Sequence, residues 1–286
     1  MKTLPEYFKQ AKQEKWALGH FNFSTADQLR AIVEVAAEMK SPVMVATSEG
    51  EDAFLGHEQT VALVKSWQAA GYPIFLNADH HKTWESVKGA MDAGYDTVLI
   101  DASKLPYEEN LILTTKVVQY AKNKDHTMMV EGELGYLMGE SSVQKRVDIK
   151  PEDYTKPEEA KDFVRKTGVE RLAIAFGNAH GIITEQEEHL DLELLKKIVK
   201  AVPNTYLVLH GGSGLPPEEV RQAIALGITN VHINTELRLA YQEALRKKLM
   251  DDPDQTTPYK FLGPSFEAAK NLVRQKLDLF GAVGRI

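Results

Sequence analysis

The sequence contains no cysteine. Disulfide bonds, thiolate nucleophiles and cysteine metal sites are therefore excluded, and a bound metal would need His, Asp or Glu ligands. No stretch of the chain approaches the ~18 consecutive apolar residues of a membrane span. The first residues, 1–6, lack the apolar core of a signal peptide, so a cytoplasmic location without membrane contact is expected.

Positive charge is also scarce. The chain carries 34 Lys and Arg against 41 Asp and Glu, which gives a formal net charge of −7. The basic residues are scattered and form no stripe that could follow a phosphate backbone, so nucleic acid is not expected as a partner. Because 43% of the side chains are hydrophobic, the chain can nevertheless bury a large core.

Short apolar runs alternate with segments of helical period along the whole chain. Segments such as 29–37 and 192–199 show the i, i+3, i+4, i+7 spacing of an amphipathic helix. Eight runs have the character of strands, at residues 16–21, 43–46, 74–76, 97–100, 128–130, 172–176, 206–209 and 231–233. Eight strand–helix units without a linker predict an α/β fold, a (β/α)8 TIM barrel forming one domain over residues 1–286. A doubly wound sheet is the alternative, but no G-x-G-x-x-G motif follows the first strand.

Two regions interrupt this alternation. Residues 135–154 are polar, and a connection of that length is typical of a lid or of a disordered segment. After the eighth run, a helix is expected over residues 235–249, followed by a break at 251–258 and an extra C-terminal helix over about residues 265–280. The last helix lies outside the eightfold repeat and would pack on the barrel or on a partner subunit.

Polar residues follow the ends of the eight runs. They are Asn22, Ser48, Asp79 with His80, Asp101, Glu131 with Glu133, His180, His210 and Asn234. In barrel enzymes the loops at these strand ends converge and carry the chemistry. Three of the residues are histidines, and three histidines with an open fourth position are how a catalytic zinc is held. One such histidine alone would more often be a hydrogen-bonded core residue.

The remaining histidines are expected to be structural or solvated; these include His20, His57, His126 and His189. A glycine-rich turn at residues 211–217 follows the seventh run. Exposed backbone N–H groups bind anions, and the loops after strands seven and eight form the usual phosphate site of barrels. Beside His210, the turn indicates a phosphorylated substrate. A lysine Schiff base is less favoured, because Lys82 and Lys104 lie beyond the strand ends.

Taken together, these motifs resemble those of the class II, zinc-dependent ketose-bisphosphate aldolases, in the shorter subgroup that includes fructose- and tagatose-bisphosphate aldolases. The matching stretches follow the family order across nearly the whole chain, at residues 21–22, 48–50, 79–81, 100–103, 131–135, 177–181, 210–214, 234–236 and 273–276. The resemblance implies a lyase of glycolysis and carbohydrate metabolism. Its reaction would be reversible aldol cleavage of fructose or tagatose 1,6-bisphosphate to dihydroxyacetone phosphate and glyceraldehyde 3-phosphate.

The resemblance also implies roles for individual residues. His80, His180 and His210 would bind the catalytic Zn²⁺, and Asp101 and Glu133 match positions that hold a second or displaced metal ion. Asp79 would exchange a proton with the aldehyde oxygen. Substrate-binding positions are Asn22, Ser48, Gly181, Gly211, Gly212, Ser213, Asn234, Thr235 and Arg274. The phosphate site would include a monovalent cation, Na⁺ or K⁺, and Arg274 would come from a neighbouring subunit of a homodimer or homotetramer.

Two positions depart from the family pattern. The family has a glycine pair and then acidic residues after the position of Gly135, and one of those acids is the C–H base. Here Glu140 is the only acid in residues 136–142 and is therefore the candidate base, with a solvated side chain as the alternative. His232 stands where the family has asparagine, and it either binds the substrate or packs in the barrel. These departures leave open an aldolase of another ketose 1-phosphate with a different aldehyde, or a non-catalytic phosphosugar- or metal-binding homologue.

Overall fold

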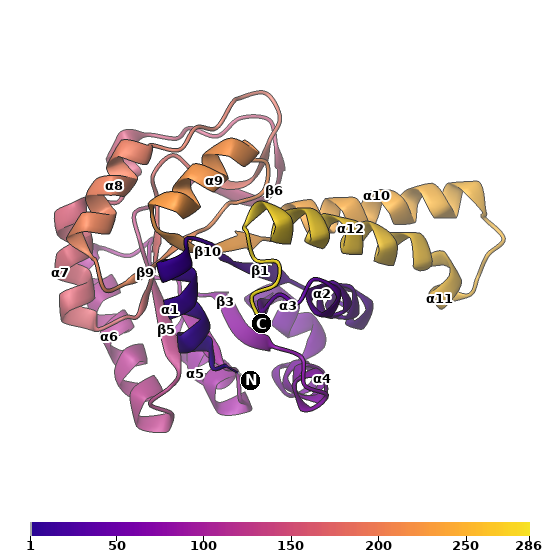
Figure 1. Cartoon of the computed structure of the whole chain (residues 1–286), viewed down its shortest axis with the longest axis horizontal. Coiled ribbons are helices and arrows are strands. Elements are labelled where there is room, and N and C mark those ends of the chain that lie inside the picture. Colours follow the sequence, from indigo (N-terminus) through magenta and orange to yellow (C-terminus); the bar gives the residue numbers. More distant parts are fainter. Residues whose placement is uncertain (1) are drawn as a thin grey trace.

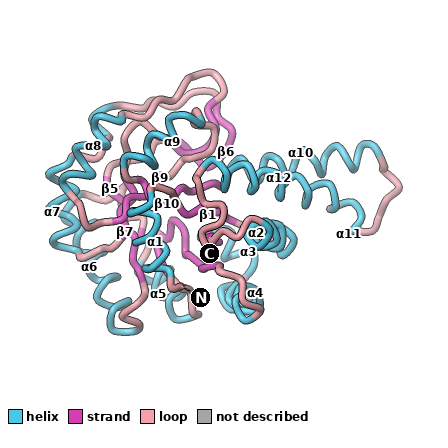
Figure 2. The backbone as a smooth tube through the Cα atoms, viewed as in Figure 1, coloured by secondary structure: helices cyan, strands magenta, loops and turns pink. Residues whose placement is uncertain are grey.

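The computed structural model describes residues 2–286. Within them, eight parallel strands close into a barrel in the order β1-β10-β9-β7-β5-β4-β3-β2. The barrel strands are β1 (Leu18–Asn22), β2 (Val43–Ser48), β3 (Ile74–His81), β4 (Thr97–Ile100), β5 (Met129–Leu134), β7 (Arg171–Ile174), β9 (Tyr206–Leu209) and β10 (Ile228–Ile233). Each overlaps one of the predicted runs, so the (β/α)8 prediction is confirmed. Figure 2 shows the strands at the centre and the helices around them.

The helices cover the outside of the barrel. They are α1 (Leu4–Glu14), α2 (Ala26–Glu38), α3 (Glu49–Leu55), α4 (His57–Ala69), α5 (Trp84–Ala93), α6 (Tyr107–Lys124), α7 (Pro157–Thr167), α8 (Leu192–Ala201), α9 (Pro217–Leu226), α10 (Thr235–Asp251), α11 (Pro258–Phe261) and α12 (Gly263–Leu279). Because both faces of a parallel barrel strand are covered, the strands are buried along almost their whole length. No helix within residues 2–286 has the length and apolar character needed to cross a membrane.

Strand register brings the polar strand ends together. Strands β2 and β3 pair in parallel from Val43 with Ile74 to Ser48 with Asp79, so the last residues of both strands reach the same mouth of the barrel. Asn22, the last residue of β1, pairs with Ala46, which lies two residues before Ser48 in β2. The carboxyl ends of the strands therefore form one continuous rim.

Helix α1 closes the opposite, amino-terminal mouth. Its Tyr7 ring lies 5.9 Å from the ring of Phe75 at the start of β3. Its Phe8 ring lies 5.1 Å from Tyr206 at the start of β9, and the guanidinium of Arg171 at the start of β7 lies over the same ring. Tyr7 and Phe8 are buried. These contacts seal the barrel floor and leave the carboxyl mouth as the accessible end.

The prediction of a lid or disordered loop at residues 135–154 was wrong in part. Strand β6 (Gly139–Gln144) pairs in parallel with β8 (His180–Ile183) to form a small second sheet, and a 3-10 helix follows at Pro151–Asp153. The residues of β6 are mostly exposed and polar, so the strand has no apolar run to reveal it in the sequence. Its register pairs Gly139 with His180.

Helices α10 and α12 form an arm that extends away from the barrel, with α11 at its far end (Figure 1). The predicted helices at 235–249 and about 265–280 are confirmed as α10 and α12, which pack along each other. Within α10 only Thr235 and Leu237, next to the barrel, are buried. Helix α10 therefore packs mainly on α12, and α12 in turn packs on α2.

Candidate active site

A cavity of about 610 Å³ opens at the carboxyl mouth of the barrel. Most of the residues predicted from the sequence line it: Asn22, Ser48, Asp79, His80, Asp101, Glu140, His180, Gly181, His210, Gly211, Ser213, His232, Asn234 and Thr235. They come from all parts of the chain and meet because the parallel strands end at one rim. Proximity in the cavity therefore depends on the fold and not on local sequence.

Three histidine rings converge at the centre of this cavity. His80 lies near the end of β3, His180 begins β8, and His210 follows β9. The ring centroid of His80 is 4.9 Å from that of His180 and 4.7 Å from that of His210. His80 Nε2 and His210 Nδ1 are 2.9 Å apart. His80 takes a left-handed backbone conformation, φ 49°, which is costly for a residue other than glycine and is found at functional sites.

The ring nitrogens that point away from this centre are held by carboxylates. His80 Nδ1 lies 3.0 Å from Asp101 Oδ2 and 3.5 Å from Glu133 Oε2. His210 Nε2 lies 2.7 Å from Glu131 Oε1. Metal-binding histidines characteristically use their second nitrogen in this way, because the carboxylate fixes the ring and makes it more basic. The donor set therefore fits a metal ion bound through His80 Nε2, His210 Nδ1 and the ring of His180.

Asp101 and Glu133 therefore contact His80 itself, whereas the sequence suggested them as ligands of a second metal ion. Glu133 does offer an oxygen within reach of both His80 and His180. Burial and the adjacent Asp101 carboxylate raise the pKa of Glu133 to about 7. Burial disfavours a charged ring at His80, but Asp79, Asp101 and Glu133 outweigh it and raise the pKa of His80 to about 10. In the metal-free protein His80 thus carries a proton that a metal must displace.

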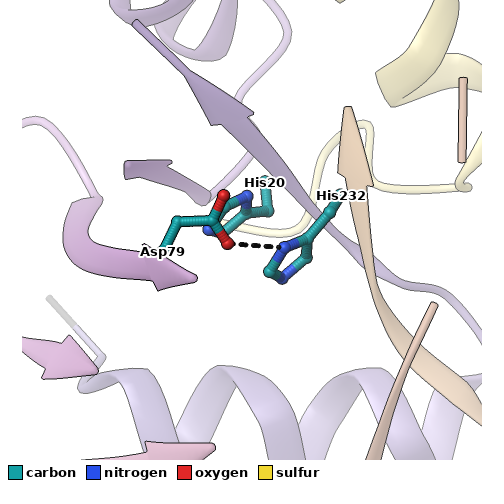
Figure 3. A group of neighbouring side chains, drawn as sticks. All are labelled: His20, Asp79 and His232. Carbon is teal, nitrogen blue, oxygen red and sulfur yellow. Dashed lines mark ion pairs between the residues drawn. The ribbon is translucent and has the colours of Figure 1, made fainter. Parts of the chain in front are cut away.

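Asp79 lies beside the histidine cluster with its carboxylate held on two sides. Asn22 Nδ2 donates to Asp79 Oδ2 over 3.0 Å, and His232 Nδ1 lies 3.3 Å from Asp79 Oδ1 (Figure 3). Burial opposes ionisation of Asp79, but the charge of His80 and the contact with His232 lower its pKa well below the usual range. Asp79 is therefore an ionised carboxylate at the cavity wall, able to accept a proton.

His232 is packed between two other histidine rings. Its ring stacks on His20 at a centroid distance of 3.4 Å and an interplanar angle of 4°, and on His210 at 4.1 Å. Its Nε2 lies 3.1 Å from Asn230 Oδ1. His20, which the sequence predicted to be structural or solvated, is fully buried behind His232 and Asp79 and does not line the cavity (Figure 3). Its stacking on His232 joins strands that are distant in the sequence, so nothing in the sequence indicated this contact.

The part of the cavity wall that follows His180 and His210 has the features of an anion site. Gly181 and Gly211 have positive φ angles of 91° and 62°. A Cβ atom on Gly211 would lie 1.8 Å from the carbonyl oxygen of Ala179, so only glycine fits there. Ser213 and the first turn of α10 complete this wall, where the N-terminal end of the helix favours a negative group.

Three predicted residues do not line the cavity. Glu133 lies behind His80, and Gly212 packs against the strand beside it, where a Cβ would lie 2.7 Å from Val231 Cγ1. Arg274, on α12, pairs at the surface with Glu38, with Nη2 2.7 Å from Oε2. Within one chain Arg274 is therefore not brought to the site.

Several charged residues of the site escaped the sequence interpretation. Arg238, one turn into α10, donates to Ser141 Oγ over 2.8 Å at the cavity wall. Glu51 accepts from Asn22 Nδ2 over 2.9 Å and from the backbone of Ser48 over 2.7 Å, and burial raises its pKa. Glu51 lies three residues after Ser48, a spacing typical of a helix capping box, so the sequence does not indicate that Glu51 also lines the cavity. Lys82, Lys104 and Ser24 also line the wall.

A closed parallel barrel with a histidine cluster, flanking carboxylates and an anion-binding wall at its carboxyl mouth defines a barrel enzyme with a metal centre. The sequence model of the class-II fructose-bisphosphate aldolases matches residues 2–285. The fructose-bisphosphate aldolase of Geobacillus stearothermophilus is 36% identical over 289 aligned positions, which cover 99% of this chain and 98% of that protein.

Solved structures give the same result. The crystal structure of the YdjI aldolase from Escherichia coli K12 matches with a TM-score of 0.82 and 29% identity, over 99% of this chain and 98% of that one. A fructose-bisphosphate aldolase structure from Campylobacter jejuni, 21% identical, shares the fold with a TM-score of 0.81 over 99% and 95% of the two chains. The chain belongs to the class II fructose-bisphosphate aldolase family, and it is an aldolase of the metal-dependent class.

Replacing Glu131 by Gln should weaken zinc binding by about 10- to 100-fold, because the amide orients His210 less strongly than the carboxylate does. A competition titration against a chromogenic zinc chelator measures the change. Glu109→Gln, at an exposed position of α6, is the matched control. Circular dichroism checks that the variant is folded, since Glu131 also pairs with Arg171. Equal affinities for folded Glu131→Gln and wild type would contradict the assigned role.

Zinc binding should depend on pH through His80. Below its folded-state pKa of about 10, this ring is protonated without metal, so zinc must release its proton. Apparent affinity should rise with pH over the neutral range, by up to about tenfold per pH unit. Calorimetric titration in two buffers of different ionisation enthalpy measures proton release, with at least one proton per zinc expected. A binding heat that does not depend on the buffer would exclude this linkage.

Proposed function

We propose that the protein catalyses reversible, zinc-dependent aldol cleavage of a ketose 1,6-bisphosphate, fructose or tagatose, to dihydroxyacetone phosphate and glyceraldehyde 3-phosphate. The observation that carries the proposal is the convergence of His80, His180 and His210 in one cavity with Asp79 and the glycine-rich anion wall. The fructose-bisphosphate aldolase named for the Geobacillus relative supports the choice of substrate.

Zinc, when bound by the three histidines, supplies a Lewis acid that polarises the ketose carbonyl. Asp101, Glu133 and Glu131 keep the histidine rings oriented toward that position. The N–H groups around Gly181 and Gly211, with Ser213, Asn234 and Thr235, bind the phosphate of the dihydroxyacetone half. A monovalent cation, Na⁺ or K⁺, would balance charge at this end.

Asp79 and Glu140 each carry out one of the two proton transfers. In cleavage, Asp79 accepts the proton of the hydroxyl whose oxygen becomes the aldehyde, while the bond between the two halves of the substrate breaks. Glu140 then returns a proton to C3 of the ketose, the carbon that becomes the hydroxymethyl group of dihydroxyacetone phosphate; in the condensation direction it removes that proton. Glu140 lies on β6, at the cavity wall and exposed, so its carboxylate can reach the substrate from above the histidine cluster.

Exchange of a proton on the hydroxymethyl carbon of dihydroxyacetone phosphate with deuterated water, followed by NMR, tests this function. Zinc-loaded wild type should exchange the proton, a chelator should abolish the exchange, and Glu140→Ala should slow it by a factor of about 10² or more. Glu152→Ala removes an exposed acid from the same connection and should leave the rate unchanged. His180→Ala should lose both zinc and cleavage of the bisphosphate.

Absence of exchange in metal-loaded wild type would refute the proposal. Zinc and phosphosugar binding without exchange would instead identify a non-catalytic homologue. Exchange without cleavage of either bisphosphate would identify an aldolase for another aldehyde.

We further propose that two or more copies associate through the arm. Leu249, Met250 and Tyr259 at its far end are 44%, 75% and 77% exposed, although large apolar side chains at a projecting tip are costly in water. A partner copy that covers the tip would remove this surface from water. In such an assembly Arg274, on the same arm, would contribute to the active site of a neighbouring copy.

Light scattering coupled to size exclusion measures this association. Wild type should have the mass of a dimer or tetramer, and the double variant Met250→Asp, Tyr259→Asp should be monomeric. Lys247→Ala, exposed on the same helix, should keep the wild-type mass. A monomeric wild type would disprove the assembly.

A further inference from the structure

A second group of metal-ligating side chains lies outside the catalytic cavity. It consists of Asp52 on α3, His57 at the start of α4 and His81 at the end of β3. Strand β3 is irregular at this point, because its register with β4 shifts between Ala78 and His81 and His80 has a left-handed backbone. Asp79 and His80 therefore both line the cavity, whereas His81 points outward beneath α3 and α4. None of the three residues lines the catalytic cavity.

Their ligand atoms converge on one point. Asp52 Oδ2 lies 3.0 Å from His57 Nε2 and 3.0 Å from His81 Nε2. Yet within the described residues neither Asp52 Oδ2 nor His81 Nε2 makes a hydrogen bond of acceptable geometry, although both side chains are buried. Ligand atoms on a tetrahedral zinc lie roughly 3.3 Å apart. The spacing and the missing hydrogen bonds are what a small cation between the three atoms would require.

The other polar atoms of these ligands are already engaged. Asp52 Oδ1 accepts hydrogen bonds from Thr47 Oγ1, over 2.6 Å, and from the Tyr95 hydroxyl. His81 Nδ1 lies 2.6 Å from Ser86 Oγ. These contacts fix the carboxylate and the ring so that Oδ2 and Nε2 are the atoms that face each other. The catalytic histidines are held in the same way, by partners on the nitrogen opposite the metal.

The group also has an access path. The side chain of His57 is 30% exposed, so a cation and a water ligand can reach it from solvent. Its ring lies against Gly89 of α5, where an added Cβ would be 3.3 Å from His57 Cε1. The absence of a side chain at Gly89 leaves room for the ring to sit in this position.

We propose that Asp52, His57 and His81 form a second metal site, with two histidines, one carboxylate and water as ligands. This donor set suits Zn²⁺ or Co²⁺, and not Mg²⁺ or Ca²⁺, which prefer oxygen ligands. The site would tie α3 and α4 to the end of β3. His81 also accepts, through its backbone oxygen, a hydrogen bond from the N–H of Asp101 over 2.8 Å. A cation there therefore stiffens the segment that carries His80 without contacting the substrate.

Metal content per chain, measured by mass spectrometry after stripping, reloading with Zn²⁺ or Co²⁺ and dialysis, tests the proposal. Wild type should hold two equivalents. His57→Gln and His180→Ala should each hold one, and the double variant none. His57→Gln should keep its aldolase activity, which shows that it is folded. His126→Gln, an exposed histidine far along the chain on the α6–β5 connection, should still hold two.

The Co²⁺ protein gives a second readout, because the visible absorption of His57→Gln subtracted from that of wild type isolates the spectrum of the second ion. One equivalent in wild type, lost in His180→Ala and unchanged in His57→Gln, would overturn the proposal and leave a hydrogen-bonded network. A second equivalent that survives His57→Gln but disappears in Asp101→Asn would also overturn it, because that ion would belong to the acids around His80.

Discussion

The catalytic centre depends on one buried ion pair beneath it. Arg171 and Glu131 are both fully buried, with Nη1 2.6 Å from Oε2, and the other oxygen of Glu131 holds His210. An uncompensated charge left in such a place costs about 3–5 kcal/mol, so loss of either partner alone is strongly destabilising. Asn77 receives a further hydrogen bond from Arg171. The barrel interior is thus polar where Arg171, Glu131 and Asn77 meet, and this group holds His210, the proposed zinc ligand, from below.

The same carboxylate–imidazole arrangement recurs around β3. Adjacent residues of this strand, His80 and His81, face opposite sides of the barrel wall, and each meets a carboxylate, Asp101 inside and Asp52 outside. The inner pair adjusts the protonation of a catalytic ligand. The outer pair anchors the helices that flank the strand. The end of β3 therefore contacts both the cavity, through His80, and the surrounding helices, through His81.

The sequence predicted correctly the features that repeat along the chain and the polar residues that lie at strand ends. The eight apolar runs and the residues that follow them predicted the barrel and most of the cavity wall. Strand β6 was missed because it has no apolar pattern. It is a strand only through its pairing with β8, which the sequence does not reveal. Arg171 was missed because a charged residue at the start of a strand has no local signature. The contacts of Arg171 with Glu131 and of His20 with His232 join residues that are distant in the sequence, so neither could be predicted from it.

The contact of Gly211 with Ala179 has a consequence for the metal centre as a whole. Because the Cα of Gly211 rests against a main-chain carbonyl, the segments that carry His180 and His210 touch without any side chain between them. Their separation is set by a van der Waals contact between two main-chain segments. Substitutions among the surrounding core side chains can alter packing and stability without changing the groups that make this contact. A side chain introduced at position 211 would instead push the two histidine-bearing segments apart.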